Sequence, residues 1–597
     1  MRVLLRSFLS AIKDLNVLVD LPGHFDGHER RLVFQAIVIG ILVWGIVFAL
    51  KSSVHLVFSH LLAWLEHTPY PFLVFIPLFL AGALVSLLAR FKPTLINYRD
   101  ADGHIHELND VEGDGLERAI ALYYSSEPQF ESSLLGQNGI EARWEMPTFS
   151  LVWRKFLATF LTLGGGGSGG LEASVTLIGE STASGLFKPR RIRKQEAEGW
   201  WGRLKRWWGS SNTDDLQTAQ LCGIAAAVAT LLGTAFTAAF FAIEVMYRRR
   251  PVVEKLIYAL VSSLTALILS SFVVHEGGLF QVEEVLFPVI STRYYLALII
   301  MAIAIALLSV YFGRLRSSFE ASFLHLQPNS LRRHLLGAGF TAAIALLVYY
   351  LLPLFAHYNL IPQEALSHRF ALILGPGEEA IDLALSGHMV FWVALIALFG
   401  KMLATLATVG SGGSAGLLVP SIFFGTMVAT IMARLFGLEP QTLIVPAMTA
   451  SLVSIVNVPL AAVFLPFELF GQAYLLPALV VLIVCFLFAH QNTIYRTQRE
   501  THAKREILPG YGSRRVGVPK EWAGKSLLSL DLRRRFEVSV VGIIERYEQN
   551  GRLNPRVQLN PAATKVLSED DVLVVIGTNS QLDDFETKVQ QDSQGSD

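Results

Sequence analysis

The chain has 597 residues, of which 52% are hydrophobic and 16% charged, and its formal net charge is zero. Soluble domains carry about 25% charged residues, so this balance, with a mean hydropathy of +0.46, excludes an ordinary soluble protein. Because the net charge is zero, it gives no indication of a nucleic-acid partner. The composition predicts a polytopic helical membrane protein.

The chain begins with a basic, amphipathic segment, residues 1–29. Lys13 and Asp14 cut its apolar stretch short and no small-residue cleavage site follows, so we predict an interfacial cytoplasmic helix rather than a signal peptide. Residues 30–495 carry uncharged apolar runs that are typical of membrane-spanning and broken helices. These runs are Leu32–Leu50, Pro69–Ala89, Tyr294–Phe312, Leu335–Phe355, Met389–Gly400 and Leu469–Ala489.

Basic residues indicate the orientation. The insert 187–215 contains KPRRIRKQEAEGWWGRLKRWW, and Arg248–Arg250 follow the next apolar stretch. Positive charge favours the cytoplasmic side, so Leu216–Tyr247 is predicted to form two shorter helices, broken near Gly233, that enter and leave on that side. The paired tryptophans mark either the membrane interface or a solvated loop. We expect a bacterial-type inner or plasma membrane protein with both ends in the cytoplasm.

An internal repeat indicates a duplicated membrane unit. GGSGGLEAS at Gly166–Ser174 matches GGSAGLLVP at Gly412–Pro420 at five of nine positions. Further along, TAAFFAIEVM resembles LAAVFLPFELF and pairs Glu244 with Glu468. Duplicated transporters place their site at the repeat interface, on half-helix N-termini near the middle of the bilayer.

The glycine runs themselves are predicted to bind an anion. Backbone N–H groups at helix N-termini carry partial positive charge, and they release an anion more readily than full basic side chains would. Glycine lets the backbone approach the ion, and each run ends at a predicted helix start, at Leu171–Ser174 and at Pro420. A flexible linker is the alternative interpretation, but both flanks of each run are apolar.

These motifs resemble those of the CLC family of chloride channels and proton/chloride antiporters, in order over about residues 30–495. Gly170–Ser174 resembles the family's Gly-Lys/Arg-Glu-Gly-Pro motif, Gly416–Pro420 its Gly-x-Phe-x-Pro motif, and Gly113–Glu117 its Gly-Ser-Gly-Ile-Pro motif. Tyr495 resembles its pore-lining tyrosine. The resemblance implies an all-α membrane fold of two antiparallel (inverted) repeats of tilted, partly broken helices, assembled as a homodimer with one pore per subunit.

The resemblance also implies a site. Glu172 would be the gating acid, which competes with the anion when it is ionised and releases the site when it is protonated; an acid that merely caps the helix dipole is the alternative. Neither a metal nor a cofactor is implied. The implied anion contacts are Asp114, Gly115, Glu172, Ala173, Gly416, Leu417, Leu418 and Tyr495.

One departure from the family bears on mechanism. Family antiporters often carry a second proton-binding glutamate where this chain has Val245, and an aliphatic side chain cannot relay a proton. A gated passive channel for an anion, chloride first, is therefore favoured. A proton-coupled antiporter of chloride, another halide or nitrate is the alternative, and a non-conducting membrane sensor is a remote one. Glu244 and Glu468 are expected to be structural acids satisfied by helix termini.

Two further departures concern the anion contacts. Asp114 stands where the family has a serine that touches the central anion. A carboxylate about 4 Å from chloride repels it by several kcal/mol at an intermediate effective dielectric. Either Asp114 is protonated, or its side chain turns away, or the permeant ion differs from chloride; our hypothesis is that Asp114 weakens the central site. Leu418 replaces the family's phenylalanine, and backbone donation is expected to survive this change.

The C-terminal part is predicted to be a separate cytoplasmic α+β domain. Residues 496–513 are interpreted as a linker, 514–588 resemble a TrkA-C (RCK-C) regulatory domain, and 589–597 are interpreted as a disordered tail. Strands are predicted at Glu537–Tyr547 and Asp570–Thr578. Such domains dimerise and often bind a small ligand, here unidentified; a purely structural tail is the alternative.

An enzymatic function is not expected. Gly413–Gly416 reads Gly-Ser-Ala-Gly, a pattern compatible with a serine nucleophile, but that chemistry needs a general base within hydrogen-bond reach. His388 and His490 lie at the ends of apolar runs rather than within them. The duplicated Gly-Gly-Ser at Gly166–Ser168 favours an architectural role instead.

Overall fold

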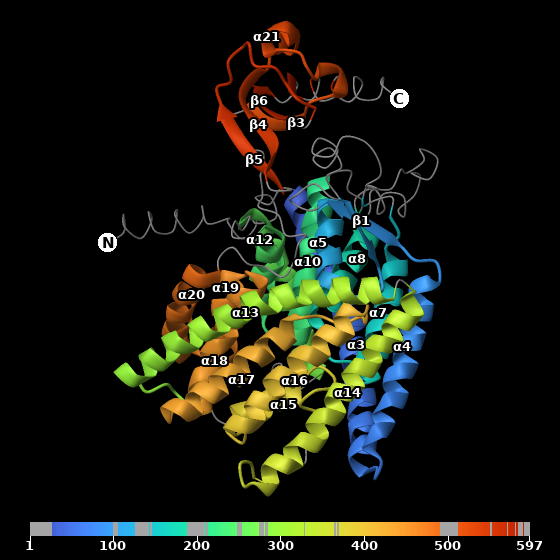
Figure 1. Ribbon diagram of the computed structural model, residues 1–597, viewed down its shortest axis with the longest axis vertical. Helices are drawn as coiled ribbons and strands as arrows, with labels where there is room; N and C mark the ends of the chain where they lie inside the picture. Colours follow the sequence, from blue (N-terminus) through green and yellow to red (C-terminus); the bar gives the residue numbers. More distant parts are fainter. Residues whose placement is uncertain are drawn as a thin grey trace, which may run out of the picture. The chain divides into compact units, whose positions relative to one another are not determined.

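A computed structural model describes residues 27–99, 105–125, 143, 146–187, 208, 213–247, 253–273, 280, 285–327, 329–362, 366, 369–489, 511–549, 552–569, 571–578, 581, 582, 585 and 589. Tyr495, the predicted N-terminal helix as far as residue 26 and most of the basic insert lie outside these residues. The chain divides into two compact units (Figure 1). The first comprises Met1–Ile96, Glu107–Tyr123 and Met146–Arg499, and the second Asn97–His106, Tyr124–Glu145 and Glu500–Asp597.

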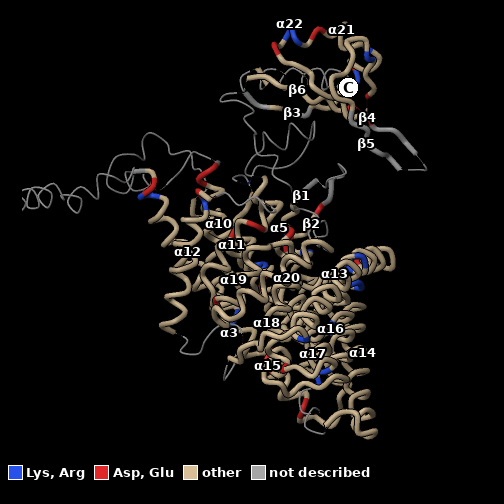
Figure 2. The backbone as a smooth tube through the Cα atoms, turned by 90° about the vertical axis from the view of Figure 1, so that its left-hand side faces the viewer, with Lys and Arg blue, Asp and Glu red and all other residues tan. Residues whose placement is uncertain are grey.

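The first unit is helical, and Figure 2 shows long uncharged stretches of helix in it. Among the described residues, eight helices are long and apolar enough to span a membrane. A two-stranded sheet, β1 (Leu95–Arg99) and β2 (Ile105–Asn109), precedes α5. The helices of the first half are α3 (Gly27–His67), η1 (Pro71–Val74), α4 (Phe75–Arg90), α5 (Gly115–Tyr124), α7 (Phe149–Gly164), α8 (Glu172–Phe187), α10 (Thr213–Leu232), α11 (Ala235–Tyr247) and α12 (Val253–Val273).

The second half repeats this order of helices. Its members are α13 (Thr292–Leu326), α14 (Ser330–His357), α15 (Glu378–Leu385), α16 (Phe391–Gly410), α17 (Leu418–Phe436), α18 (Pro440–Ser451) with the π-helical turn η4 (Leu452–Val456), α19 (Pro459–Phe470), η5 (Gln472–Tyr474) and α20 (Leu475–Ala489). The break predicted near Gly233 is confirmed, because α10 ends at Leu232 and α11 begins at Ala235. The predicted insert 187–215 overlaps helices at both ends: Phe187 closes α8, and Thr213 opens α10.

Reciprocal hydrogen bonds join the two halves at their centre and confirm the duplication. The amide of Ser168 donates to Thr408 Oγ1, and the amide of Ser414 donates to Thr162 Oγ1, both at 3.1 Å. Each partner stands 246 residues from its counterpart, the offset of the glycine motif. Two hydroxyl pairs, each 3.0 Å apart, follow the same offset: Ser168–Thr405 and Ser414–Thr159.

Glu244 and Glu468 each bind the N-terminus of a helix that belongs to the other half. The Glu244 carboxylate accepts the amides of Leu460 and Ala461 at 2.9 Å, at the N-terminus of α19. In return Glu468 accepts backbone N–H groups at the N-terminus of α11. These donors are Ala235 at 3.1 Å, Phe236 at 2.9 Å and Thr237 at 2.7 Å. The expectation that helix termini satisfy both acids is confirmed, because unpaired helix-terminal amides need such partners; that their role is purely structural stays a prediction.

The second unit contains a four-stranded antiparallel sheet of order β3-β6-β4-β5. A buried apolar core that includes Val516, Trp522, Leu573 and Phe585 holds it together. Its elements are β3 (Tyr511–Gly517), η6 (Lys520–Trp522), α21 (Leu527–Leu530), α22 (Leu532–Phe536), β4 (Ser539–Gln549), β5 (Arg552–Leu559) and β6 (Val572–Thr578).

Two predicted boundaries of this unit are wrong. The predicted linker 496–513 runs too far, because Tyr511 already pairs with Thr578 in the sheet. The predicted tail 589–597 starts too early, because Val589 is buried in the core. The strands β3 and β5 were not predicted. Both lie at sheet edges, where a strand has a single neighbour and tolerates polar residues and proline.

Candidate functional site

The two glycine motifs meet directly in the first unit. The amide of Gly170 donates to the carbonyl of Gly416 at 2.8 Å, and the amide of Gly416 donates back to the carbonyl of Gly170 at 2.7 Å. Helix α8 starts two residues later at Glu172, and α17 starts at Leu418. The predicted helix starts are therefore confirmed, and two helix N-termini from opposite halves converge on this bridge.

The segment that contains Gly115 also approaches the start of α8. A Cβ at Gly416 would lie 2.9 Å from both the backbone nitrogen and Cβ of Ala173, and a Cβ at Gly115 would lie 3.0 Å from the Ala173 carbonyl carbon. Real Cβ atoms do not approach so closely, so these positions require glycine. The structure thus brings together Gly115, Ala173 and Gly416, with Leu417 and Leu418 buried beside them.

The Glu172 carboxylate lies within this junction and is 1% exposed. A Cβ at Gly170 would collide with its Oε2, and a Cβ at Gly416 would lie 3.2 Å from it. Among the residues that the structure describes, neither carboxylate oxygen has a hydrogen-bond donor. A capping acid would accept amide hydrogens; gating and capping both stay hypotheses for Glu172. An ionised carboxylate in this position is costly unless it gains a proton or moves.

Asp114 is buried close to the junction, but its carboxylate is directed at its own helix. Its Oδ1 accepts the amide of Leu116 at 2.8 Å, as an N-cap of α5 does. Three ion pairs connect residues 110–117 to arginines on α7, α14 and α13. These pairs are Asp110 with Arg154 at 2.5 Å, Glu112 with Arg333 at 2.6 Å and Glu117 with Arg316 at 3.1 Å. That Asp114 weakens anion binding stays a prediction.

Two fully buried lysines, which the sequence reasoning missed, organise the loops beside the site. Lys155 of α7 donates to the carbonyls of Gly113 at 2.8 Å and Val111 at 3.2 Å. Lys401 of α16 donates to Gly375 at 2.6 Å and also to the two preceding carbonyls. The lysines stand 246 residues apart, the offset of the glycine motif. That shared offset was the sequence signal that could have identified them.

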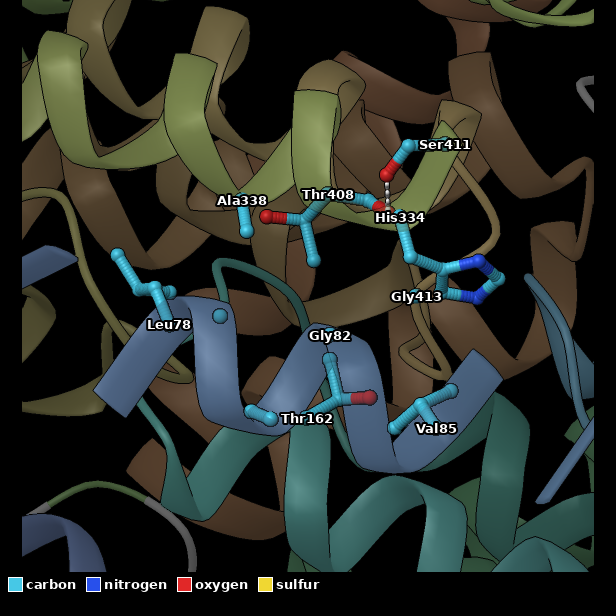
Figure 3. A pocket seen from close by; sticks show the side chains of 11 residues that line it. Leu78, Gly82, Val85, Thr162, His334, Ala338, Thr408, Ser411 and Gly413 are labelled. Carbon is cyan, nitrogen blue, oxygen red and sulfur yellow. Dashed lines mark hydrogen bonds between the residues drawn. The ribbon is translucent and has the colours of Figure 1, made fainter. Parts of the chain in front are cut away.

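A pocket lies next to the glycine loops, between α4 and α14 (Figure 3). Its walls include the repeat-related pairs Thr162 with Thr408 and Gly167 with Gly413. The His334 ring also lines it and approaches the Gly412 carbonyl at 3.1 Å through Nε2. None of the predicted anion contacts lines this pocket, so it is distinct from the Glu172 junction.

The remaining predicted positions are accounted for as follows. Val245 is fully buried in α11, next to the capping acid Glu244. The Ser414 hydroxyl is paired with the Thr159 hydroxyl. Within the described parts of the chain, no three His, Cys, Asp or Glu side chains gather into a metal site. Tyr495 lies outside the described residues.

Comparison with known proteins agrees with this geometry. Residues 121–490 match the family described as voltage gated chloride channel, and residues 513–590 match the TrkA-C domain. A relative from Escherichia coli (strain SMS-3-5), described as the voltage-gated ClC-type chloride channel ClcB, is 23% identical over 362 residues, which are 58% of this chain and 76% of the relative.

Solved structures share the fold. A CLC-type fluoride/proton antiporter and a slow cyanobacterial Cl⁻/H⁺ antiporter each superpose with a TM-score of 0.56 at 19% identity. Each covers 78% of this chain, and the chain covers 97% and 96% of them respectively. The match over residues 121–490, together with this fold and the meeting of the two glycine motifs, places the chain in the CLC family of integral membrane anion-transport proteins, with a TrkA-C domain at its C-terminus.

Proposed function

We propose that this chain conducts an anion, chloride first, through the junction of Gly115, Ala173 and Gly416, and that Glu172 gates the pathway. The observation that carries the proposal is the buried Glu172 carboxylate, which has no donor among the described residues yet lies where two helix N-termini converge. These termini offer partial positive charge to an anion. A carboxylate and an anion compete for that charge, and protonation removes the carboxylate from the competition.

The lead candidate is a gated passive channel, because α11 carries Val245 beside a Glu244 that is already bound to α19. Proton-coupled antiport is the second candidate. It is favoured by a second buried acid on α8, Glu180, and by the fluoride/proton and Cl⁻/H⁺ antiporters that share the fold. Since these relatives differ in the anion named, chloride and fluoride need to be compared in the same assay.

Flux from reconstituted liposomes tests the gate. Acidification neutralises Glu172 and frees the site, so we expect anion efflux from wild-type protein to rise as pH falls. Glu172→Gln removes the charge permanently. It should conduct at neutral pH at a rate about tenfold above wild type or more, corresponding to at least about 1.4 kcal/mol, and should lose the pH dependence. A Glu172→Gln variant that titrates like wild type would contradict the gate, and wild-type protein without chloride or fluoride flux would favour the non-conducting sensor.

We also propose that two copies assemble through the outer face of α11 and α19. Phe236 of α11 and Leu460 of α19 are exposed, and Phe464 stacks on Phe240 at 4.8 Å between ring centroids, so aromatic side chains of the two helices are in contact. Phe236→Cys should give cross-linked dimers in native membranes, since Cys222 and Cys485 are buried. A cysteine at exposed Leu347 on α14 is the matched control. Equal cross-linking at both positions would argue against this interface.

A further inference from the structure

Helices α4 and α14 pack side by side (Figure 1), and the end of α4 lies next to the start of α14. The Ser86 and Ser330 hydroxyls are 3.2 Å apart, and the Arg90 guanidinium donates to the side-chain oxygen of Asn329, which caps α14. Helix α3 leaves the side that carries the basic N-terminal segment and α4 returns to it. This end of the helix pair therefore belongs to the cytoplasmic side of the membrane.

Two exposed arginines lie at this end, Arg90 on the last turn of α4 and Arg332 on the first turn of α14. Among the residues that the structure describes, neither has a carboxylate partner. Glu112, the acid that accepts the hydroxyl of the same turn, is already paired with Arg333 at 2.6 Å. Two guanidinium groups without a carboxylate are suited to a phosphate, which their forked N–H donors match in geometry.

An apolar stripe on α4 leads from the arginines toward the middle of the membrane. Its side chains are all exposed and are spaced four, three and four residues apart, which puts them on one side of the helix. They are Leu80, Leu84, Leu87 and Phe91. A free phosphate would have no use for this stripe, whereas a phospholipid has a phosphate for the arginines and an acyl chain for the stripe.

The first turn of α14 also holds the second glycine segment. Arg333 Nε donates to the carbonyl of Ser411 at 3.1 Å, and His334 Nε2 lies 3.1 Å from the carbonyl of Gly412. The Gly113 amide donates to the same Gly412 carbonyl at 3.2 Å. A ligand that fixes this turn therefore also steadies the loops that lead to both sides of the junction.

We propose that Arg90 and Arg332 bind the headgroup of an anionic phospholipid of the cytoplasmic leaflet, with one acyl chain along the apolar stripe of α4. Each arginine near an anionic headgroup strengthens binding about fivefold. The bound lipid stabilises the first turn of α14 and, through it, the glycine loops. The binding site does not depend on the proposed anion pathway, whereas its effect on flux rests on that pathway.

Thermal unfolding of the full-length protein in detergent measures binding. The probes are dioleoyl phosphatidylglycerol, dioleoyl phosphatidylcholine and free glycerol phosphate. Phosphatidylglycerol should raise the melting temperature of wild-type protein in a saturable manner. The other two should raise it little, because phosphatidylcholine has no net charge and glycerol phosphate has no acyl chain. Arg90→Gln and Arg332→Gln should each raise the half-saturating concentration of phosphatidylglycerol about fivefold.

Arg293→Gln is the matched control, because it neutralises an exposed arginine at the end of α13 that is remote from α14. It should keep the wild-type half-saturating concentration. Equal stabilisation by phosphatidylglycerol and phosphatidylcholine, or by glycerol phosphate, overturns the lipid site. Equal half-saturating concentrations in wild type and both arginine variants overturn it as well. If Arg90→Gln does not fold because Asn329 loses its donor, Arg332→Gln decides alone.

Anion efflux from liposomes tests the link to the junction. Wild-type flux should be about fivefold higher in mixed phosphatidylglycerol and phosphatidylcholine than in phosphatidylcholine alone. The double variant Arg90→Gln, Arg332→Gln should lower this ratio to less than about twofold, and Arg293→Gln should keep it. An unchanged ratio in the double variant overturns the link to flux. Absence of flux in every lipid overturns the proposed anion pathway, while the unfolding result still decides the binding site.

Discussion

Glu172 and Glu180 show how neighbours give one residue type two behaviours. Both are buried in α8. Glu172 faces glycine backbone and has no donor among the described residues, whereas Glu180 accepts two hydroxyls and an amide. Burial of an uncompensated charge is costly and a hydrogen-bonded one is tolerated. The first acid is therefore costly to keep ionised, whereas the donors around the second stabilise its carboxylate.

Substitution of Gly416 tests whether the close backbone contact at the junction is needed for anion flux. Gly416→Ala places a Cβ 2.9 Å from two Ala173 atoms, so the α8 start has to shift, and we expect anion flux to fall about tenfold. Gly45→Ala on α3, where a Cβ would meet nothing within 4 Å, should leave flux unchanged. Flux and thermal unfolding in detergent are measured on both. Wild-type flux from Gly416→Ala would show that the contact is not needed.

Substitution of Lys401 tests whether the buried ammonium groups stabilise the fold. Lys401→Met removes the ammonium donor from the carbonyls of residues 373, 374 and 375. The Gly375 carbonyl keeps the amide of Gly169, and a buried carbonyl that is left unpaired costs about 1–3 kcal/mol. We expect a clear loss of thermal stability, with Lys155→Met behaving alike. Exposed Lys92→Met serves as the control and should change the unfolding free energy by less than about 0.5 kcal/mol. Equal melting temperatures for all three variants would refute the structural role.

At the scale of helices, α11 and α19 depend on each other for their caps. Neither N-terminus has a capping side chain from its own preceding residues; the carboxylates of Glu468 and Glu244 supply the acceptors instead. This exchange ties helix formation in one half to packing against the other. It also gives a structural reason for two acids in otherwise apolar sequence.

Removal of one such acid should destabilise the protein. Glu244→Ala leaves the buried amide of Ala461 without its acceptor, and the loss of a helix cap costs about 0.5–2 kcal/mol. Thermal unfolding in detergent measures the effect, with exposed Glu254→Ala of α12 as the control. A Glu244→Ala protein as stable as the control would mean that water or another group replaces the cap.

For the molecule as a whole, the sequence predicted the features that depend on hydropathy and on repeated glycine. The helical membrane unit, the repeat and the nearness of Glu172 to Gly416 follow from those patterns; the direct bridge between Gly170 and Gly416 was not predicted. The positions of Lys155 and Lys401 did not follow from these patterns, because charged residues in apolar sequence are normally assigned to helix ends, and the main-chain carbonyls that these lysines bind come from distant segments. Strand β3 was also not predicted, because its own residues are mostly polar and its extended conformation depends on pairing with β6.

The C-terminal part of the second unit should fold without the membrane part, because its core is formed by its own strands and short helices. A fragment of residues 505–597 is expected to unfold cooperatively on heating. Its one tryptophan, Trp522, is 3% exposed, so its fluorescence should shift to longer wavelength at the transition. A fragment with the emission of a solvated tryptophan at all temperatures would show that the unit needs the rest of the chain.

The crossed Ser–Thr bonds at the centre of the membrane unit limit how it can work. Ser168 and Ser414 each fasten one half to the other through both main chain and hydroxyl, and the Gly170–Gly416 bridge lies two residues away. If one half rocked against the other, all these hydrogen bonds between fully buried residues would have to break. We therefore predict that side-chain movement within a fixed backbone opens and closes the proposed passage, and that spin labels placed on opposite halves keep a constant separation when the anion or the pH is changed.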